Sequence, residues 1–304
     1  LADAATSPKR AHARLKRELV RDPKCLLDLP RGFSYRLISR MGDPMSDGYR
    51  VPGRPDAMGV FAGEPGTFVV MRNHELPVGA NSIGPLMPGQ LPPKEAYDPE
   101  AAGGVTRLVI DEKTLEVKSQ NLVLTGTYWN CAGGLSPWGW LTCEELFAPK
   151  HGYVFLCDAS AKSVAAPKRI PLYGRFRHEA AVVDPNTLIA YLTEDDPNAA
   201  FYRFVPSSRD TPFEGKLQAL AVAGKPGFDT STMSMGQRLR VEWVDVPEPD
   251  PEVDNVRHQA HERGAASFRR NEGLWLAGND VFFTATTGGP IGSGQIFRLR
   301  VAPD

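Results

Sequence analysis

The stretch Leu188-Ile-Ala-Tyr-Leu-Thr-Glu-Asp-Asp196 is a short apolar strand that runs directly into a cluster of acids. Three other stretches follow the same plan, with acids or hydroxyls at the strand end: Thr67-Phe-Val-Val-Met-Arg-Asn-His-Glu75, Trp138-Gly-Trp-Leu-Thr-Cys-Glu-Glu145 and Val281-Phe-Phe-Thr-Ala-Thr-Thr287. In a radially repeated β fold, equivalent strands end on the same face. The repeat therefore predicts that these terminal acids converge on one place.

Each repeat contains a hairpin and a further strand. Glu179-Ala-Ala-Val-Val-Asp184 precedes the first stretch across the turn Pro185-Asn-Thr187, and Ala200-Phe-Tyr-Arg-Phe-Val205 follows it. The same order recurs three times, starting near Gly59, Cys131 and Glu272. We therefore predict an all-β fold, a β-propeller with four-stranded blades, of which four can be counted.

The length and composition suit one such domain. The chain has 304 residues, with 29 Gly and 27 Pro, which indicates many tight turns between short strands. We expect an N-terminal extension over residues 1–30, with a short helix over 11–20, and a propeller over residues 31–304. The sequence holds no run of 18 apolar residues, so no membrane span is expected, and we expect a monomer.

Several function classes lack their sequence signals. The net charge is −1 and arginines are scattered, so nucleic-acid binding is not expected. The Gly-x-Ser-x-Gly, Gly-x-x-x-x-Gly-Lys-Ser/Thr and His-Glu-x-x-His motifs are all absent. Serine hydrolase, P-loop and zincin functions are therefore not indicated.

Alignment of the repeats places Cys131, Glu179 and Glu272 at one position, the head of the first strand of successive blades. First strands lie innermost in a propeller, so we expect this thiol and these two carboxylates to share a site near the axis. Acids at the ends of the second strands would add a second ring around them: Glu75, Glu144, Glu145, Glu194 and Asp195.

So many neighbouring acids need a counter-charge, because like charges raise one another's pKa. A metal ion is the simplest one. Carboxylates favour calcium, whereas a thiolate favours a transition metal such as iron or zinc. Of the other cysteines, Cys143 and Cys157 lie in mid-strand and are expected to be structural, whereas Cys25 stays open as a surface thiol or a disulfide partner.

Several blocks of the chain resemble the PhoX-type alkaline phosphatases, in the same order and over roughly Gly59 to Arg300. They are Asn73-His-Glu75, Asn130-Cys-Ala-Gly-Gly134, Pro137-Trp-Gly139, Leu141-Thr-Cys-Glu-Glu145, His151-Gly-Tyr-Val-Phe155, Gly174-Arg-Phe-Arg-His-Glu-Ala180, Tyr191-Leu-Thr-Glu-Asp195 and Asn271-Glu-Gly273. The resemblance implies a periplasmic or secreted β-propeller enzyme that hydrolyses small phosphate monoesters with a mixed iron and calcium centre.

Carried over residue by residue, the resemblance implies iron-side ligands and calcium-side ligands. The iron-side set is Cys131, Glu179 and Glu272, and the calcium-side set is Glu144, Glu194 and Asp195. A cluster of this kind would bind the phosphoryl oxygens and neutralise charge in the transition state. Arg203 is the candidate for a cationic side chain that would hold the phosphate beside the catalytic residues.

Two features depart from the family pattern. The His151 block continues with Leu156 and Cys157, where the family usually has an acid. The family also usually has further blades after the position of Arg300. We therefore expect either a small ring, closed by Phe33-Ser-Tyr-Arg-Leu-Ile38 as an added strand, or an incomplete one.

Two alternative functions stay open at this stage. The first is a non-catalytic propeller that is stabilised by calcium and binds a protein partner. The second is a calcium-dependent esterase or lactonase, which would need the ring of carboxylates but not Cys131.

Overall fold

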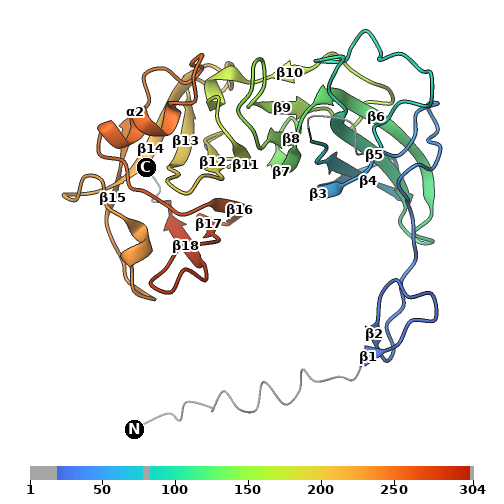
Figure 1. Cartoon of the computed structure of the whole chain (residues 1–304), viewed down its shortest axis with the longest axis horizontal. Coiled ribbons are helices and arrows are strands. Elements are labelled where there is room, and N and C mark those ends of the chain that lie inside the picture. Colours follow the sequence, from blue (N-terminus) through green and yellow to red (C-terminus); the bar gives the residue numbers. More distant parts are fainter. Residues whose placement is uncertain (1–18, 78–82, 302–304) are drawn as a thin grey trace. The chain divides into compact units, whose positions relative to one another are not determined.

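The computed structural model describes residues 19–77 and 83–301 (Figure 1). The chain divides into two compact units, residues 1–39 and 40–304, whereas the sequence predicts a boundary after residue 30. Most of the helix expected over residues 11–20 lies outside the described residues, and Leu19–Val20 form a strand instead.

The first unit is organised around one carboxylate. Strand β1 (Leu19–Val20) pairs with β2 (Leu29–Pro30), and the turn between them wraps around Asp22. The Asp22 carboxylate accepts hydrogen bonds from the backbone N–H groups of residues 24, 26 and 27 and from the hydroxyl of Tyr35. Phe33–Ile38 form no strand, so the expectation that this segment closes a ring was wrong.

The second unit contains four antiparallel sheets in which sequential strands are neighbours, and each sheet is one blade. Blade 1 has β3 (Pro55–Ala62), β4 (Thr67–His74), β5 (Gly103–Asp111) and β6 (Val117–Thr127). Blade 2 has β7 (Asn130–Ser136), β8 (Gly139–Glu144), β9 (Val154–Cys157) and β10 (Lys168–Arg169).

The later blades differ in strand number. Blade 3 has five strands, β11 (His178–Val183), β12 (Ala190–Glu194), β13 (Phe201–Pro206), β14 (Gly215–Val222) and β15 (Val241–Asp245). Blade 4 has three, β16 (Asn271–Ala277), β17 (Asp280–Ala285) and β18 (Gln295–Arg300). The helix α2 (Val256–Glu262) and two 3₁₀ turns, Pro171–Tyr173 and Thr230–Thr232, complete the regular elements of the described chain.

The cores of the second unit lie between consecutive blades, because strands alternate the face to which side chains point. In β11, Ala181 and Val183 pack toward blade 2, whereas Val182 packs toward blade 4. Phe201 of blade 3 stacks on Phe283 of blade 4 with ring centroids 4.0 Å apart. Trp140 and Phe155 of blade 2 join a third core with blade 1.

Within this unit the blades follow one another with their first strands, β3, β7, β11 and β16, on one common side (Figure 1). This arrangement confirms the all-β, propeller-like fold that the sequence predicts, with four blades of four, four, five and three strands. No closed ring of sheets forms among the described residues. Over the same residues, the structure contains no helix that is long and apolar enough to cross a membrane.

Hydrogen bonds from buried side chains join one blade to the first strand of the next. The amide of Asn73 in β4 donates to the carbonyls of Cys131 (3.0 Å) and Ala132 (2.7 Å) in β7, and it accepts from the indole N–H of Trp140. Thr193 of blade 3 similarly donates to the carbonyl of Glu272 in blade 4, at 2.8 Å.

We predict that Asn73→Ala lowers the free energy of unfolding by about 1–3 kcal/mol, because it leaves buried polar partners without a hydrogen bond. Urea unfolding measures this change. The exposed Asn186 in a turn provides the control, since Asn186→Ala should change the same free energy by less than about 0.5 kcal/mol. Equal effects of the two substitutions would contradict this role for Asn73.

Candidate metal centre

The first strand of every blade carries a β-bulge at its head. In blade 2, the register between β7 and β8 shifts after Asn130, so Cys131 and Ala132 together face one residue of β8. The same shift follows the equivalent residue of the other three blades, namely Pro55, His178 and Asn271. A bulge interrupts the alternation of side chains and changes the direction of the residue that it inserts.

The first bulged residue of each blade carries a metal-binding group. These four residues are Asp56, Cys131, Glu179 and Glu272. The sequence alignment had found the last three of these at one position. Asp56 is not among the predicted residues, because the repeat pattern places the start of blade 1 near Gly59, whereas β3 begins at Pro55. The acid at this strand head is the signal that could have identified it.

A second contact also repeats in all four blades, and it fixes the residue that follows the second strand beside the head of the first strand. Its backbone N–H donates to the carbonyl of the residue two positions before the bulged one. The four bonds are Glu75 to Arg54 (2.9 Å), Glu145 to Trp129 (2.9 Å), Asp195 to Arg177 (3.2 Å) and Thr286 to Arg270 (2.9 Å). Three of these four donors are acids, and together they form the expected second ring.

Cys131 is the residue that links the acids. Its sulfur lies 3.4 Å from Asp56 Oδ2 and 3.4 Å from Glu179 Oε1. The ligand atoms form two groups, Asp56–Glu75–Cys131 and Cys131–Glu145–Glu179, and within each group they lie within 4.8 Å of one another. Cys131 belongs to both groups, so blades 1 and 2 contribute atoms to one space and blades 2 and 3 to another, and each space is small enough for a metal coordination sphere.

The electrostatics of these groups indicate that a cation belongs there. Burial, together with the charges of Glu145 and Glu272, raises the pKa of Glu179 well above its usual value. Burial and the neighbouring Asp195 raise the pKa of Glu145 to about 8. Burial, Glu179 and Asp56 raise the pKa of the Cys131 thiol.

One buried atom supports the same conclusion. The Oε2 atom of Glu179 has no hydrogen-bond partner among the described residues, although the side chain is only 5% exposed. A thiol also has one hydrogen, so Cys131 cannot donate to Asp56 and Glu179 at once. The donor set therefore fits a metal ion, which would satisfy Glu179 and favour the ionised forms of all these groups.

Arg270 lies at the blade 4 side of the site. Its Nε and Nη2 atoms pair with both oxygens of Asp195, at 2.8 and 2.5 Å, and Nη2 also lies 3.0 Å from Glu272 Oε1. Hydrogen bonding and charge from Asp195 raise the pKa of the guanidinium further. The side chain is 42% exposed, so this cation is accessible beside the acids.

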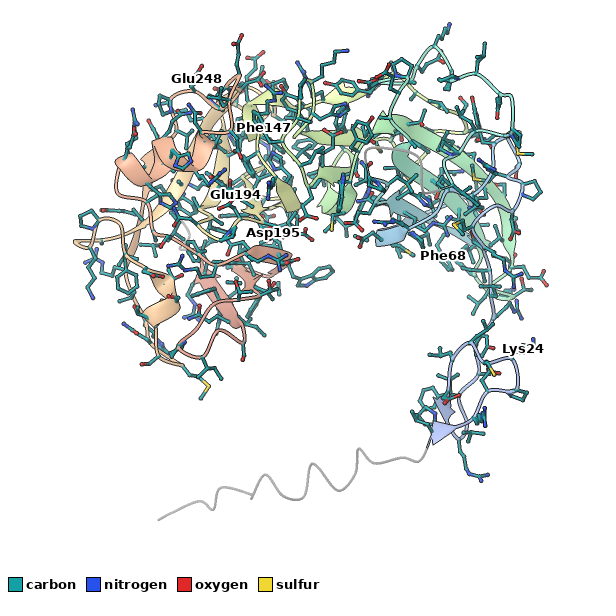
Figure 2. All side chains as sticks on the ribbon, viewed as in Figure 1. Lys24, Phe68, Phe147, Glu194, Asp195 and Glu248 are labelled. Carbon is teal, nitrogen blue, oxygen red and sulfur yellow. The ribbon has the colours of Figure 1, made fainter. Side chains whose placement is uncertain are left out.

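Glu144 and Glu194, which the family resemblance predicts as calcium ligands, belong to neither of the two groups around Cys131. Glu144 and Glu194 are the last residues of β8 and β12 and are fully buried, whereas Glu145 and Asp195 come directly after these strands. Glu194 and Asp195 are labelled in Figure 2. Because adjacent residues of an extended chain point to opposite sides, only one acid of each pair can face the cluster. Glu194 accepts hydrogen bonds from the backbone N–H of Ala200, the hydroxyl of Tyr202 and the guanidinium of Arg257.

Arg203, the arginine that we expect to bind phosphate, does not lie at the candidate metal centre. Arg203 lies on β13, the third strand of blade 3, where its Nε donates to Gln218 and its guanidinium lies 4.4 Å from the ring centre of Trp243. It is two strands away from β11 and therefore not beside Cys131. All four cysteines are free thiols, with Cys143 and Cys157 buried and Cys25 exposed.

Comparison with known proteins identifies the family. Residues 15–123 and 147–300 match the family described as alkaline phosphatase PhoX. The chain belongs to the PhoX alkaline phosphatase family. This membership makes the protein a phosphatase, as the sequence blocks indicate. The gap in the match, residues 124–146, contains the bulge of blade 2 and both Cys131 and Glu145.

A solved structure supports the fold assignment. Pseudomonas fluorescens PhoX, determined in complex with the transition-state analogue vanadate, superposes with a TM-score of 0.61 at 18% sequence identity. The alignment covers 88% of this chain and 70% of that chain. No curated protein matches the sequence.

We predict that the metal-free protein loses stability as the pH rises from about 6.5 to about 8. Glu145, with a folded pKa of about 8 and an ordinary value of 4.5, stays protonated longer in the folded state, and Glu179 shifts in the same direction. The buried His74 and His178, with pKa values of about 3, oppose this trend only below their ordinary value of 6.5.

Calorimetry of the chelator-treated protein over this pH range measures the effect as a falling Tm. Glu145→Gln is the informative variant, since an amide does not ionise and should make the slope shallower. A Tm that rises between pH 6.5 and 8 would show that the acids are not held together in the folded chain.

Proposed function

We propose that this phosphatase hydrolyses small phosphate monoesters at a mixed centre of iron and calcium built around Cys131. One observation carries the proposal: the same bulge in four blades presents a thiol and three carboxylates at equivalent positions. A stable fold alone does not require this set, because neighbouring acids without a counter-ion destabilise the folded state.

The donor types suggest how the metals would be shared. A thiolate favours iron, so Cys131 with Glu179 and Glu272 would form the iron side. Carboxylates alone favour calcium, so Asp195 and Glu145 would form the calcium side. Asp56 and Glu75 adjoin the thiol and would complete the set.

When bound, such metals supply Lewis acidity toward phosphoryl oxygens and lower the pKa of an attacking water. The chain's own residues hold the reacting groups in place. Arg270 keeps its charge and is fixed by Asp195 and Glu272, and among the described residues no hydrogen bond engages its Nη1 atom. This atom would donate to a phosphate oxygen of the substrate.

Two further arginines support an anionic substrate. Arg54 and Arg177 precede the bulged residues Asp56 and Glu179 by two positions, as Arg270 precedes Glu272, and both are exposed. Three of the four blades thus place an arginine at the same point of the repeat. We propose that they attract the phosphate group toward the acids, which would otherwise repel it.

The family resemblance also supports a periplasmic or secreted location for the protein, which would act as a monomer on a diffusing phosphoester. Cell fractionation with an antibody against the native protein tests the location. Recovery with the cytoplasmic fraction would contradict it.

We predict that Cys131→Ser lowers the rate of aryl phosphate hydrolysis by more than about 100-fold and lowers the iron content, because a hydroxyl is a poor iron ligand. Colorimetric assay and elemental analysis measure the two effects. Cys25→Ser is the matched control, since Cys25 is exposed and in the first unit, and it should change neither.

Treatment of the unaltered protein with chelator should abolish the same activity, and metal should restore it. A Cys131→Ser protein that keeps full hydrolysis would contradict the iron assignment. Calcium without iron and no hydrolysis by the metal-replete protein would favour the non-catalytic alternative.

We predict that Arg270→Ala lowers kcat/KM for an aryl phosphate by about 100- to 1,000-fold, the usual effect of removing one donor to transition-state charge. Arg203→Ala removes an arginine from the outer part of blade 3 and should leave kcat/KM within about twofold. Steady-state kinetics at matched metal content tests both. The reverse order of effects would restore Arg203 as the substrate residue.

A further inference from the structure

Glu144 is a buried acid that the phosphatase chemistry does not use. We propose that Glu144, His151 and Asp98 form a positioning network that fixes the segment before Cys131 and so sets the geometry of metal binding. The inference rests on the proposed function, in which Cys131 is a metal ligand. It concerns residues that themselves face away from the metal.

Four hydrogen-bond donors surround the Glu144 carboxylate. Oε1 accepts from the backbone N–H of Tyr128 at 3.0 Å and lies 2.7 Å from Nδ1 of His151. Oε2 accepts from the backbone N–H groups of Gly152 at 2.9 Å and Tyr153 at 3.3 Å. These hydrogen bonds join the segment before β7 to the loop after β8. The Glu144 side chain itself is fully buried.

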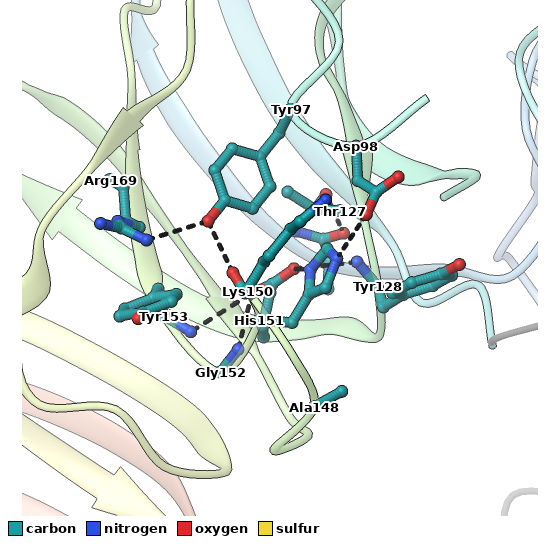
Figure 3. Close-up of polar contacts among 12 residues, drawn as sticks. Tyr97, Asp98, Thr127, Tyr128, Ala148, Lys150, His151, Gly152, Tyr153 and Arg169 are labelled. Carbon is teal, nitrogen blue, oxygen red and sulfur yellow. Dashed lines mark hydrogen bonds and ion pairs between the residues drawn. The ribbon is translucent and has the colours of Figure 1, made fainter. Parts of the chain in front are cut away.

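His151 contacts Glu144 through Nδ1 and Asp98 through Nε2, and Figure 3 shows its ring beside Asp98. The imidazole is 2% exposed, and its Nε2 atom lies 3.5 Å from Asp98 Oδ2. Tyr97 and Tyr128 flank the ring, with centroids 5.5 and 4.8 Å away. Burial alone would lower the pKa of His151, but Glu144 and Asp98 outweigh it and raise the pKa above its ordinary value.

The connection from Glu144 to the metal centre runs through Trp129. The carbonyl of Trp129 accepts from the N–H of Cys131 at 2.8 Å and from the N–H of Glu145 at 2.9 Å, so one peptide group places both candidate ligands. Trp129 has a φ of 47°, a left-handed conformation that a bulky side chain rarely adopts. Glu144 holds the preceding residue, Tyr128, and thereby supports this conformation.

Blade 3 shows that a buried acid at this position need not do the same. Glu194, the equivalent of Glu144, is also fully buried, but it bonds Ala200, Tyr202 and Arg257 rather than the segment before β11. Replacing a buried ionic network by apolar side chains often does not destabilise a protein. Burial of an acid alone thus does not show a role for Glu144. Its hydrogen bond to Tyr128, three residues before Cys131, is the contact that indicates a role in placing Cys131.

The test uses cobalt(II) added to the full-length, metal-free protein, because thiolate coordination gives an absorption band that does not depend on hydrolysis. We expect Glu144→Gln to weaken cobalt binding by about 10- to 100-fold and to shift the band, since an amide NH₂ would face a backbone N–H. His151→Gln, which keeps one donor, should lose less affinity than His151→Ala.

Glu194→Gln is the matched control for a buried acid at the same repeat position. It should lower Tm but leave the thiolate band and the cobalt affinity within about twofold. Equal loss of cobalt affinity in both glutamine variants would overturn the proposal, as would an unchanged band in Glu144→Gln. If Glu144→Gln does not fold, the His151→Gln and His151→Ala pair decides: equal and unaltered bands in both would overturn it.

The cobalt spectrum of the unaltered protein distinguishes failure of the Cys131 metal centre from failure of the Glu144 network. A thiolate band that is absent from the unaltered protein would refute the Cys131 centre, and with it the network. A band that is present, is lost in Cys131→Ser and is insensitive to Glu144 and His151 would refute the network alone.

Discussion

The β-bulge at the head of each first strand is the constraint on which the rest of the site depends. In a regular strand, side chains alternate between the two interblade cores, so none of them would point toward the metal site. The inserted residue breaks this alternation, and in four consecutive blades it is an acid or a cysteine. Of the residues before it, Asn130, His178 and Asn271 are buried, and the amides of Asn130 and Asn271 donate to Thr142 in blade 2 and to the carbonyl of Ala200 in blade 3. The site thus arises from one local irregularity repeated by the fold.

Bringing these ionisable groups together destabilises the metal-free folded state. Burial, together with the neighbouring acids, raises the pKa values of Glu145, Glu179 and Cys131, so the folded state disfavours their ionised forms. The interblade hydrogen bonds of Asn73 and Thr193 end on the carbonyls of the bulges themselves. The same contacts that join the blades therefore also fix the ligands. A metal bound there would favour the ionised forms, so the proposed centre would couple metal binding to stability.

The sequence predicted the fold class, the four repeats and three of the four bulged residues, because strand heads and strand ends can be aligned from apolar runs and turns. It could not decide which of two adjacent acids faces the centre. Glu144 and Glu145 differ by one residue, and a shift of one reverses the face in a strand. The register that selects Glu145 depends on pairing with β7, which is a tertiary contact. Arg270 was missed for a related reason, since its place beside Asp195 joins residues 75 positions apart.

We propose that a sulfur and carboxylates from separate blades bind one metal cluster. Anomalous X-ray scattering from crystals of the metal-loaded protein, recorded on both sides of the iron absorption edge, tests this most directly. We expect an iron peak within bonding distance of both Cys131 Sγ and a Glu179 oxygen, with Glu144 and Glu194 remote from any metal. An iron peak elsewhere in the chain, or none next to Cys131 in fully active crystals, would contradict it.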